Sequence, residues 1–73
     1  MARKYSNKEE HISVSDFEKR HDSIDEYEDR YDLLEDVKDC LVEYKDYSWD
    51  TLGDNTDFEI KDGVIIVDVE VYH

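Results

Sequence analysis

The 73-residue sequence has no proline, two glycines and a single cysteine. One cysteine excludes an intrachain disulfide, and the acidic residues around Cys40 should raise its pKa and leave it an inert, partly buried thiol. No apolar run approaches membrane-spanning length, and no secretory signal core is present. We therefore expect no membrane contact and a location in the cytoplasm, where free thiols stay reduced.

The motifs of common catalytic and metal sites are also missing. The three histidines show no ligand spacing, and the sequence has no H-E-x-x-H, no nucleophile elbow and no phosphate-binding glycine loop. The segment from Asp54 begins like a calcium loop, but Glu59 stands where that loop needs glycine. A chain this short seldom encloses a water-free pocket. We expect no enzyme activity, no cofactor and no bound metal.

Basic residues are scarce, and their distribution is uneven. Nine Lys and Arg stand against 22 Asp and Glu, for a net charge of −13. Residues 1–21 hold five basic and four acidic groups, whereas residues 22–73 hold four basic and eighteen acidic groups. Such a segregated negative field repels nucleic acid and anionic membranes and attracts basic surfaces. We therefore expect a basic protein as the partner and no direct nucleic-acid binding.

The chain divides into a short polar start and one domain. The polar residues 1–10 predict a flexible N-terminal segment, and residues 11–73 predict a single α+β domain. Residues 11–14 alternate polar and apolar side chains, which indicates a short strand. Ser15 and Glu18 then match a capping box, so a short helix should follow.

A longer helix is predicted from Ser23, which forms a second capping box with Glu26, to about Tyr47. Apolar residues recur through it at intervals of three and four, the period of one helix face. This predicted core face consists of Ile24, Tyr27, Tyr31, Leu34, Val37, Leu41 and Tyr44.

The C-terminal residues predict a β-hairpin. Asp62-Gly63 is a strong signal for a two-residue type I′ turn, and this turn places Phe58 opposite Val67. One face of the hairpin is then apolar, with Phe58, Ile60, Ile65, Val67, Val69 and Val71. The other face is half acidic, with Glu59, Asp68 and Glu70.

The second hairpin strand extends past the first and needs another partner, because an isolated hairpin is marginal in water. The strand at residues 11–14 would complete a small antiparallel sheet, with the long acidic helix packed on its apolar face. A second copy of the chain could pair there instead, so a homodimer stays open.

On a helical wheel, the carboxylates of the long helix form a stripe about 120° wide opposite the core face. The stripe consists of Asp25, Glu28, Asp29, Asp32, Glu35, Asp36, Asp39 and Glu43. Arg30 and Lys38 fall outside it. Five like-charge pairs at i, i+4 would cost about 1–2 kcal/mol. The stripe spans roughly 27 Å, so its linear charge density matches that of one DNA strand, with one phosphate per about 3.4 Å.

In length, charge and acidic stripe, the chain resembles a class of small, very acidic bacteriophage proteins that imitate DNA. The class includes anti-restriction proteins, uracil-DNA glycosylase inhibitors, some anti-CRISPR proteins and an inhibitor of the nucleoid protein HU. The resemblance implies a non-enzymatic competitive inhibitor in the host cytoplasm. Its carboxylates would occupy the basic DNA-binding surface of a host protein such as HU, RNA polymerase or a defence nuclease. The expected binding residues are the eight of the stripe with Glu59, Asp68 and Glu70.

Two other hypotheses stay open. The chain could be an acidic adaptor or regulatory module that binds through its sheet edge, where main-chain groups would carry the affinity. It could also be a small structural protein whose acidic face only keeps it in solution.

Overall fold

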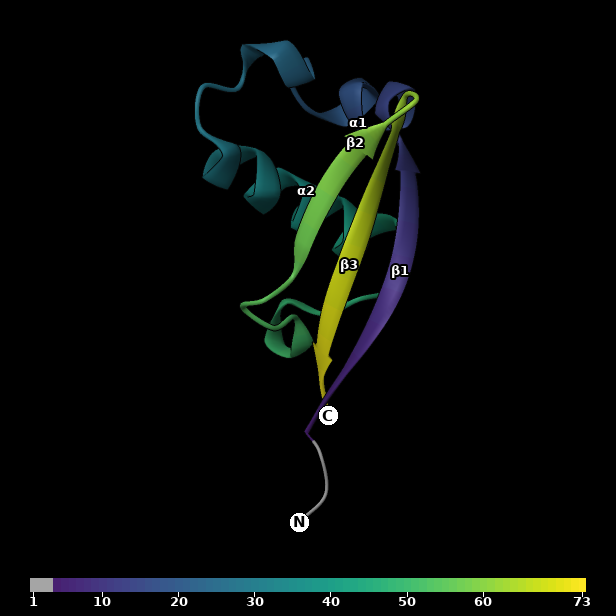
Figure 1. Cartoon of the computed structure of the whole chain (residues 1–73), viewed down its shortest axis with the longest axis vertical. Helices are drawn as coiled ribbons and strands as arrows, with labels where there is room; N and C mark the ends of the chain where they lie inside the picture. Colours follow the sequence, from purple (N-terminus) through teal and green to yellow (C-terminus); the bar gives the residue numbers. More distant parts are fainter. Residues whose placement is uncertain (1–3) are drawn as a thin grey trace.

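A three-stranded antiparallel sheet with helices packed on one face makes up the fold (Figure 1). The computed structural model describes residues 4–73. In chain order its elements are β1 (Tyr5–Ser13), α1 (Val14–Arg20), the 3-10 turn η1 (Ile24–Glu26), α2 (Arg30–Tyr44), the 3-10 turn η2 (Trp49–Thr51), β2 (Asp57–Lys61) and β3 (Val64–Tyr72). The predicted α+β class and C-terminal hairpin are confirmed.

The hairpin of β2 and β3 has the register that its turn predicts. Asp62 and Gly63 both have positive φ, 54° and 75°, as a type I′ turn requires. Phe58 lies opposite Val67. The local turn and the apolar alternation therefore agree on one pairing, since a slip of one residue would turn the apolar face to solvent.

Strand β1 pairs with the free side of β3, so the sheet order is β1-β3-β2. It begins at Tyr5, opposite Tyr72, and not at His11. Residues 5–10, which the sequence assigned to a flexible segment, therefore belong to the sheet, and residues 1–3 lie outside the described part. The nine-residue β3 offers a partner to every residue of β1, and this pairing outweighs the polar composition of the segment.

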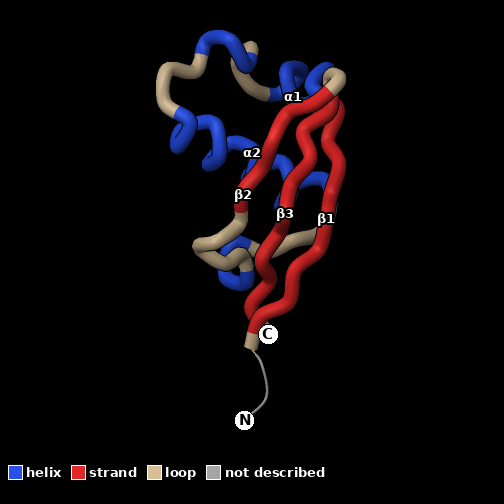
Figure 2. The backbone as a smooth tube through the Cα atoms, viewed as in Figure 1, coloured by secondary structure: helices blue, strands red, loops and turns tan. Residues whose placement is uncertain are grey.

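The helices cover a single face of the sheet (Figures 1 and 2). Helix α2 crosses behind the three strands, and its buried residues meet the inward side chains of β3. The core consists of Ile12, Phe17, Leu33, Val37, Cys40, Leu41, Phe58, Ile65, Val67 and Val69. The opposite face of the sheet, called here the outer face, carries no helix from residues 4–73.

Both helices begin at residues other than those expected. The N-cap of α1 is Ser13, whose hydroxyl accepts a hydrogen bond from the Asp16 N–H, so Ser15 lies inside the helix. The N-cap of α2 is Asp29, and Ser23 makes no side-chain cap. The predicted helix from Ser23 to Tyr47 is therefore wrong at both ends, because α2 runs from Arg30 to Tyr44.

The break before α2 has a physical cause. A helix continued back to Ile24 would add the like-charge pairs Asp25/Asp29 and Glu28/Asp32. Instead, the Glu18 carboxylate accepts the N–H of Ile24, and the ring of Tyr27 packs against Phe17 with their centroids 6.1 Å apart. These contacts turn the chain and leave residues 27–29 outside any helix.

The buried face of α2 is rotated relative to the predicted one. Leu33 and Cys40, which the helical pattern left out, are buried with Val37 and Leu41. Tyr31 and Tyr44, which the pattern included, are 69% and 52% exposed. Aliphatic side chains fit the narrow space above the sheet, whereas the large rings at the two ends of α2 reach solvent.

Gly63 gives a direct test of the hairpin turn. Gly63→Ala should lower the free energy of unfolding by about 1–2 kcal/mol, because a Cβ is disfavoured at positive φ. An added Cβ would meet no atom within 4 Å, so the loss would come from the backbone alone. Urea denaturation measures it. Gly63→Asn is the control and should lose clearly less, since asparagine tolerates this conformation; equal losses would contradict the turn assignment.

Candidate functional site

The eight carboxylates of the predicted stripe do not lie on one helix. Asp32, Glu35, Asp36, Asp39 and Glu43 lie on α2, whereas Asp25 lies in η1 and Glu28 and Asp29 lie in the connection before α2. The comparison with the charge density of a DNA strand assumed a continuous helix. It therefore fails in its original form, although all eight residues carry the negative charge expected.

Arg20, the last residue of α1, and His21, its C-cap, reach the C-terminal half of the stripe. His21 places Nδ1 3.7 Å from Asp36 and Nε2 3.4 Å from Asp39. Arg20 forms an ion pair with Glu43. Within α2, Lys38 also lies 3.9 Å from Glu35. The expectation that basic residues stay apart from the stripe is therefore wrong for Glu35 and Glu43, and helical spacing within one segment could not reveal Arg20, which another helix supplies.

Asp36 also has a structural role. The hydroxyl of Tyr27 donates a hydrogen bond to its carboxylate at 2.5 Å, and burial together with Asp36 raises the pKa of Tyr27. Asp36 and Asp39 are both half-buried. These two residues therefore tie α2 to the preceding segment, and we remove them from the candidate binding surface. Asp25, Glu28, Asp29, Asp32 and Glu35 remain exposed.

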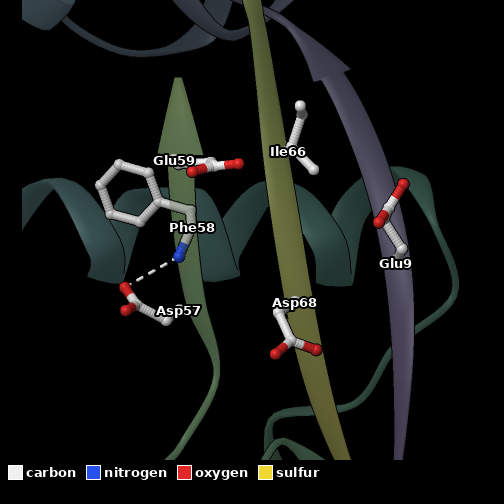
Figure 3. Close-up of a pocket in the computed structure, with 6 residues that line it drawn as sticks. All are labelled: Glu9, Asp57, Phe58, Glu59, Ile66 and Asp68. Atoms are coloured by element: carbon white, nitrogen blue, oxygen red, sulfur yellow. Dashed lines mark hydrogen bonds between the residues drawn. The ribbon is translucent and has the colours of Figure 1, made fainter. Parts of the chain in front are cut away.

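A second acidic surface lies on the outer face of the sheet (Figure 3). Glu9 of β1 and Asp57 of β2 both lie opposite Asp68 of β3, so three carboxylates form one row across the strands. Glu59 and Glu70 follow on the same face. Figure 3 shows the side chains of Glu9, Asp68 and Glu59 on the side of the strands away from α2.

The three carboxylates of the row border a shallow depression of about 470 Å³. It is lined by Glu9, Asp57, Phe58, Glu59, Ile66 and Asp68, with the same volume of about 470 Å³. A second depression of about 640 Å³ continues around the β2 edge, where Asp57 and Glu59 meet Asp29 at the start of α2. The outer face and the exposed N-terminal half of the stripe therefore adjoin at the β2 edge, where Arg30 and the apolar side chains of Leu33 and Ile60 lie between the carboxylates.

Carboxylates directly opposite each other destabilise a sheet. The row is partly compensated. Arg30 donates to Asp57 at 2.6 Å, Asn7 donates to Asp68 at 3.3 Å, and His11 lies 2.7 Å from Glu9. The Phe58 N–H, followed by Arg30, holds the pKa of Asp57 below its ordinary value. Within residues 4–73, no Lys or Arg nitrogen lies within 4.0 Å of a carboxylate oxygen of Glu9, Glu59 or Asp68.

Of these outer-face residues, the sequence predicted Glu59, Asp68 and Glu70 as binding residues and missed Glu9. Glu9 was missed because its segment was assigned to a flexible tail. The signal was present, since Ile12 faces inward and side chains alternate along a strand, which puts Glu9 on the outer face.

Other reactive groups add no chemistry. Burial, followed by the charge of Asp39, raises the pKa of Cys40 to about 11, and the residue is buried. The thiol is therefore a poor nucleophile, as expected. The described part of the chain holds no group of three or more His, Cys, Asp or Glu arranged to bind a metal. It also has no helix with the length and apolar character to cross a membrane.

The chain matches no protein-family model, and no curated protein or solved structure is significantly similar to it.

The repulsion in the row can be measured. Asp68→Asn should raise the free energy of unfolding by about 0.2–1 kcal/mol at low ionic strength, because it removes both like-charge pairs of the row, Asp57/Asp68 and Glu9/Asp68. The gain should shrink in 1 M salt, where the screening length is about 3 Å. Asp54→Asn, at an exposed turn, is the control with the same charge change. A similar gain in both variants would show that only net charge matters.

The structural role of Asp36 gives a second test. Tyr27→Phe should lower the free energy of unfolding by about 1–2 kcal/mol, because it removes a hydrogen bond to a charged group. Tyr31→Phe is the matched control, since Tyr31 is 69% exposed, and it should change stability little. Urea denaturation of both variants measures the difference, and equal stabilities would contradict the assignment.

Proposed function

We propose that this protein is a non-enzymatic inhibitor that imitates the charge of DNA and occupies the basic DNA-binding surface of a host protein. The proposal places binding on the outer face of the sheet, with Glu9, Asp57, Glu59, Asp68 and Glu70, and on the exposed carboxylates at the start of α2. It would act in the cytoplasm of the cell whose DNA-binding protein it blocks.

One observation carries the proposal: Glu9, Asp68 and Asp57 face each other across three strands on a face that no helix in the described residues covers. A face that serves only solubility can alternate its charges and avoid the repulsion. In this protein the three like-charged side chains lie side by side on the outer face of the sheet, where a partner could reach them. Arg30 pairs with Asp57 at one end of the row, but in the described part of the chain no Lys or Arg pairs with Glu9 or with Asp68 at its centre.

The shape also suits the role. The molecule measures 43 × 21 × 20 Å along its principal axes, and its long axis follows β1 and β3 (Figure 2). That length corresponds to roughly twelve base pairs at about 3.4 Å each. An elongated acidic body of this size could lie in a groove that normally holds a short stretch of duplex. Binding would then release the counterions held there, as a DNA backbone does.

A competition assay tests this function. HU bound to a labelled duplex would be titrated with the wild-type protein and with the triple variant Glu9→Gln, Glu59→Gln, Asp68→Asn. We expect wild type to displace the duplex at low salt and the triple variant to need at least about tenfold more protein. Each 1.4 kcal/mol of lost binding is tenfold in affinity, and higher salt should weaken the inhibition.

The control is the triple variant Asp46→Asn, Asp50→Asn, Asp62→Asn, which removes the same charge from exposed positions elsewhere. It should inhibit nearly as well as wild type. RNA polymerase and a restriction endonuclease would be assayed in parallel, because each also binds duplex DNA. If wild type displaces DNA from none of the three proteins, or if both triple variants lose equally, the proposed function is wrong.

A further inference from the structure

The two edges of the sheet differ in whether another strand can join them. In a two-residue hairpin, Lys61 and Val64 form the closing hydrogen-bonded pair, and main-chain groups then alternate in direction along each strand. The N–H and C=O of Phe58 therefore point out of the β2 edge. In β1, on the other side of β3, the register directs the N–H and C=O groups toward β3 at Ser6, Lys8, Glu10 and Ile12.

Side chains of the protein itself close the β2 edge. The Phe58 N–H donates to Asp57 Oδ1 at 2.8 Å, and the Phe58 carbonyl accepts from Arg30 at 2.6 Å. The guanidinium of Arg30 also lies 4.2 Å from the centroid of the Phe58 ring. Both outward groups of Phe58 are thus already satisfied, which protects the middle of this edge. Ile60 also points outward, and its main-chain groups make no hydrogen bond to any other described residue.

The β1 edge is different. By the same alternation, the N–H and C=O of Tyr5, Asn7, Glu9, His11 and Ser13 point away from β3. Within residues 4–73, no hydrogen bond reaches these outward groups of Tyr5, Asn7, Glu9 or His11. Strand β1 is nine residues long and contains no proline, so it presents an extended row of free donors and acceptors.

A second copy of the chain fits this edge poorly. In antiparallel self-pairing, outward-pointing residues must face each other, so the two-fold axis falls on a residue. The three registers with the longest overlap place the axis on Lys8, Glu9 or Glu10, and each puts two like charges opposite one another at the axis. The Glu9 register also places Lys8 opposite Glu10 twice, so there the repulsion comes from the axis pair and from the charge of the whole chain. The net charge of −13 on each copy adds repulsion.

A basic partner fits the edge well. The outer-face row runs from Asp57 on β2 through Asp68 on β3 to Glu9 on β1, so Glu9 is the carboxylate at the β1 edge. A strand added beside β1 would lie about 4.8 Å away. Its residue opposite Glu9 would then point to the outer face and continue the row. A Lys or Arg at that position would face Glu9 directly and Asp68 one strand further on, so main-chain pairing and charge would act at the same place.

We propose that an extended, basic segment of the target protein adds to the sheet as a fourth strand beside β1, with a Lys or Arg opposite Glu9. This inference rests on the proposed function and specifies how the acidic surface meets its partner. Main-chain hydrogen bonds would supply orientation, and the carboxylate row would select for basic residues at alternate positions of the segment.

Amide hydrogen exchange measured by NMR tests the geometry, with a peptide of alternating Lys and Thr as the probe. In the free protein, the amides of Asn7, Glu9 and His11 should exchange rapidly, whereas those of Lys8 and Glu10 should be protected. The peptide should slow the exchange of the three outward amides at least about tenfold. A Lys-Thr peptide with N-methylated Lys amides carries the same charge but lacks the N–H groups that would face β1, and it should not slow them.

Each alternative outcome has a distinct pattern. If the Lys-Thr peptide shifts only resonances of Glu59 and Asp68, charge alone carries binding and strand addition is overturned. If the outward amides are already protected in the free protein, and more so at higher protein concentration, a second copy occupies the edge and the proposal also fails.

Asn7→Pro removes one outward N–H and leaves the ladder with β3 intact, because proline is tolerated where the N–H faces out of a sheet. Asn7→Ala is the matched control, since both variants lose the contact to Asp68. In the HU competition assay, Asn7→Pro should inhibit at least about tenfold less well than Asn7→Ala. Circular dichroism and urea denaturation establish that both are folded.

The two proposals fail separately. If Asn7→Pro and Asn7→Ala inhibit equally while the outer-face triple variant is weak, strand addition is wrong and charge mimicry stands. If wild type does not displace DNA, the proposed function fails, and slowed exchange with the Lys-Thr peptide would still establish the edge as a site for basic strands.

Discussion

The fold depends on the central position of β3. Ile65, Val67 and Val69 are fully buried, and the strand pairs with β1 on one side and β2 on the other. The C-terminal part of β3 extends beyond the first residue of β2 and pairs with the loop that precedes β2. There the Gly53 N–H donates to the Glu70 carbonyl, and Thr56 exchanges hydrogen bonds with Glu70. One strand thus holds together a core that no disulfide braces, and the helices cover only its inward face.

Negative charge is handled in two different ways in this small molecule. On the side of α2 that meets α1, His21 and Arg20 lie against carboxylates, and Tyr27 donates to Asp36. These acidic residues stabilise the contact between consecutive segments. On the outer face, Glu9, Asp57 and Asp68 lie side by side; Arg30 pairs with Asp57 and His11 lies beside Glu9, whereas Asp68 at the centre pairs with no Lys or Arg of residues 4–73. Such an arrangement costs stability and leaves a field that a basic surface can neutralise.

Much of the fold followed from local chemistry. The Asp62-Gly63 turn predicted the hairpin register, because a two-residue type I′ turn makes Lys61 and Val64 the first pair and so fixes every later pair of the two strands. The extent of β1 did not follow, since residues 5–10 are polar and only their pairing with β3 makes them a strand. The start of α2 was equally hidden, because Glu18 and Phe17, outside the helical pattern, turn the chain before Asp29.

The sequence by itself determined the class of the fold, the hairpin and the excess of carboxylates, because turn chemistry, side-chain alternation and net charge are local or additive properties. The tertiary structure alone decided which carboxylates share a surface. It set Asp36 and Asp39 against His21 from another helix and brought Glu9 beside Asp68 from the far end of the chain. Electrostatic neighbours are set by distance in space, which spacing along one segment does not contain.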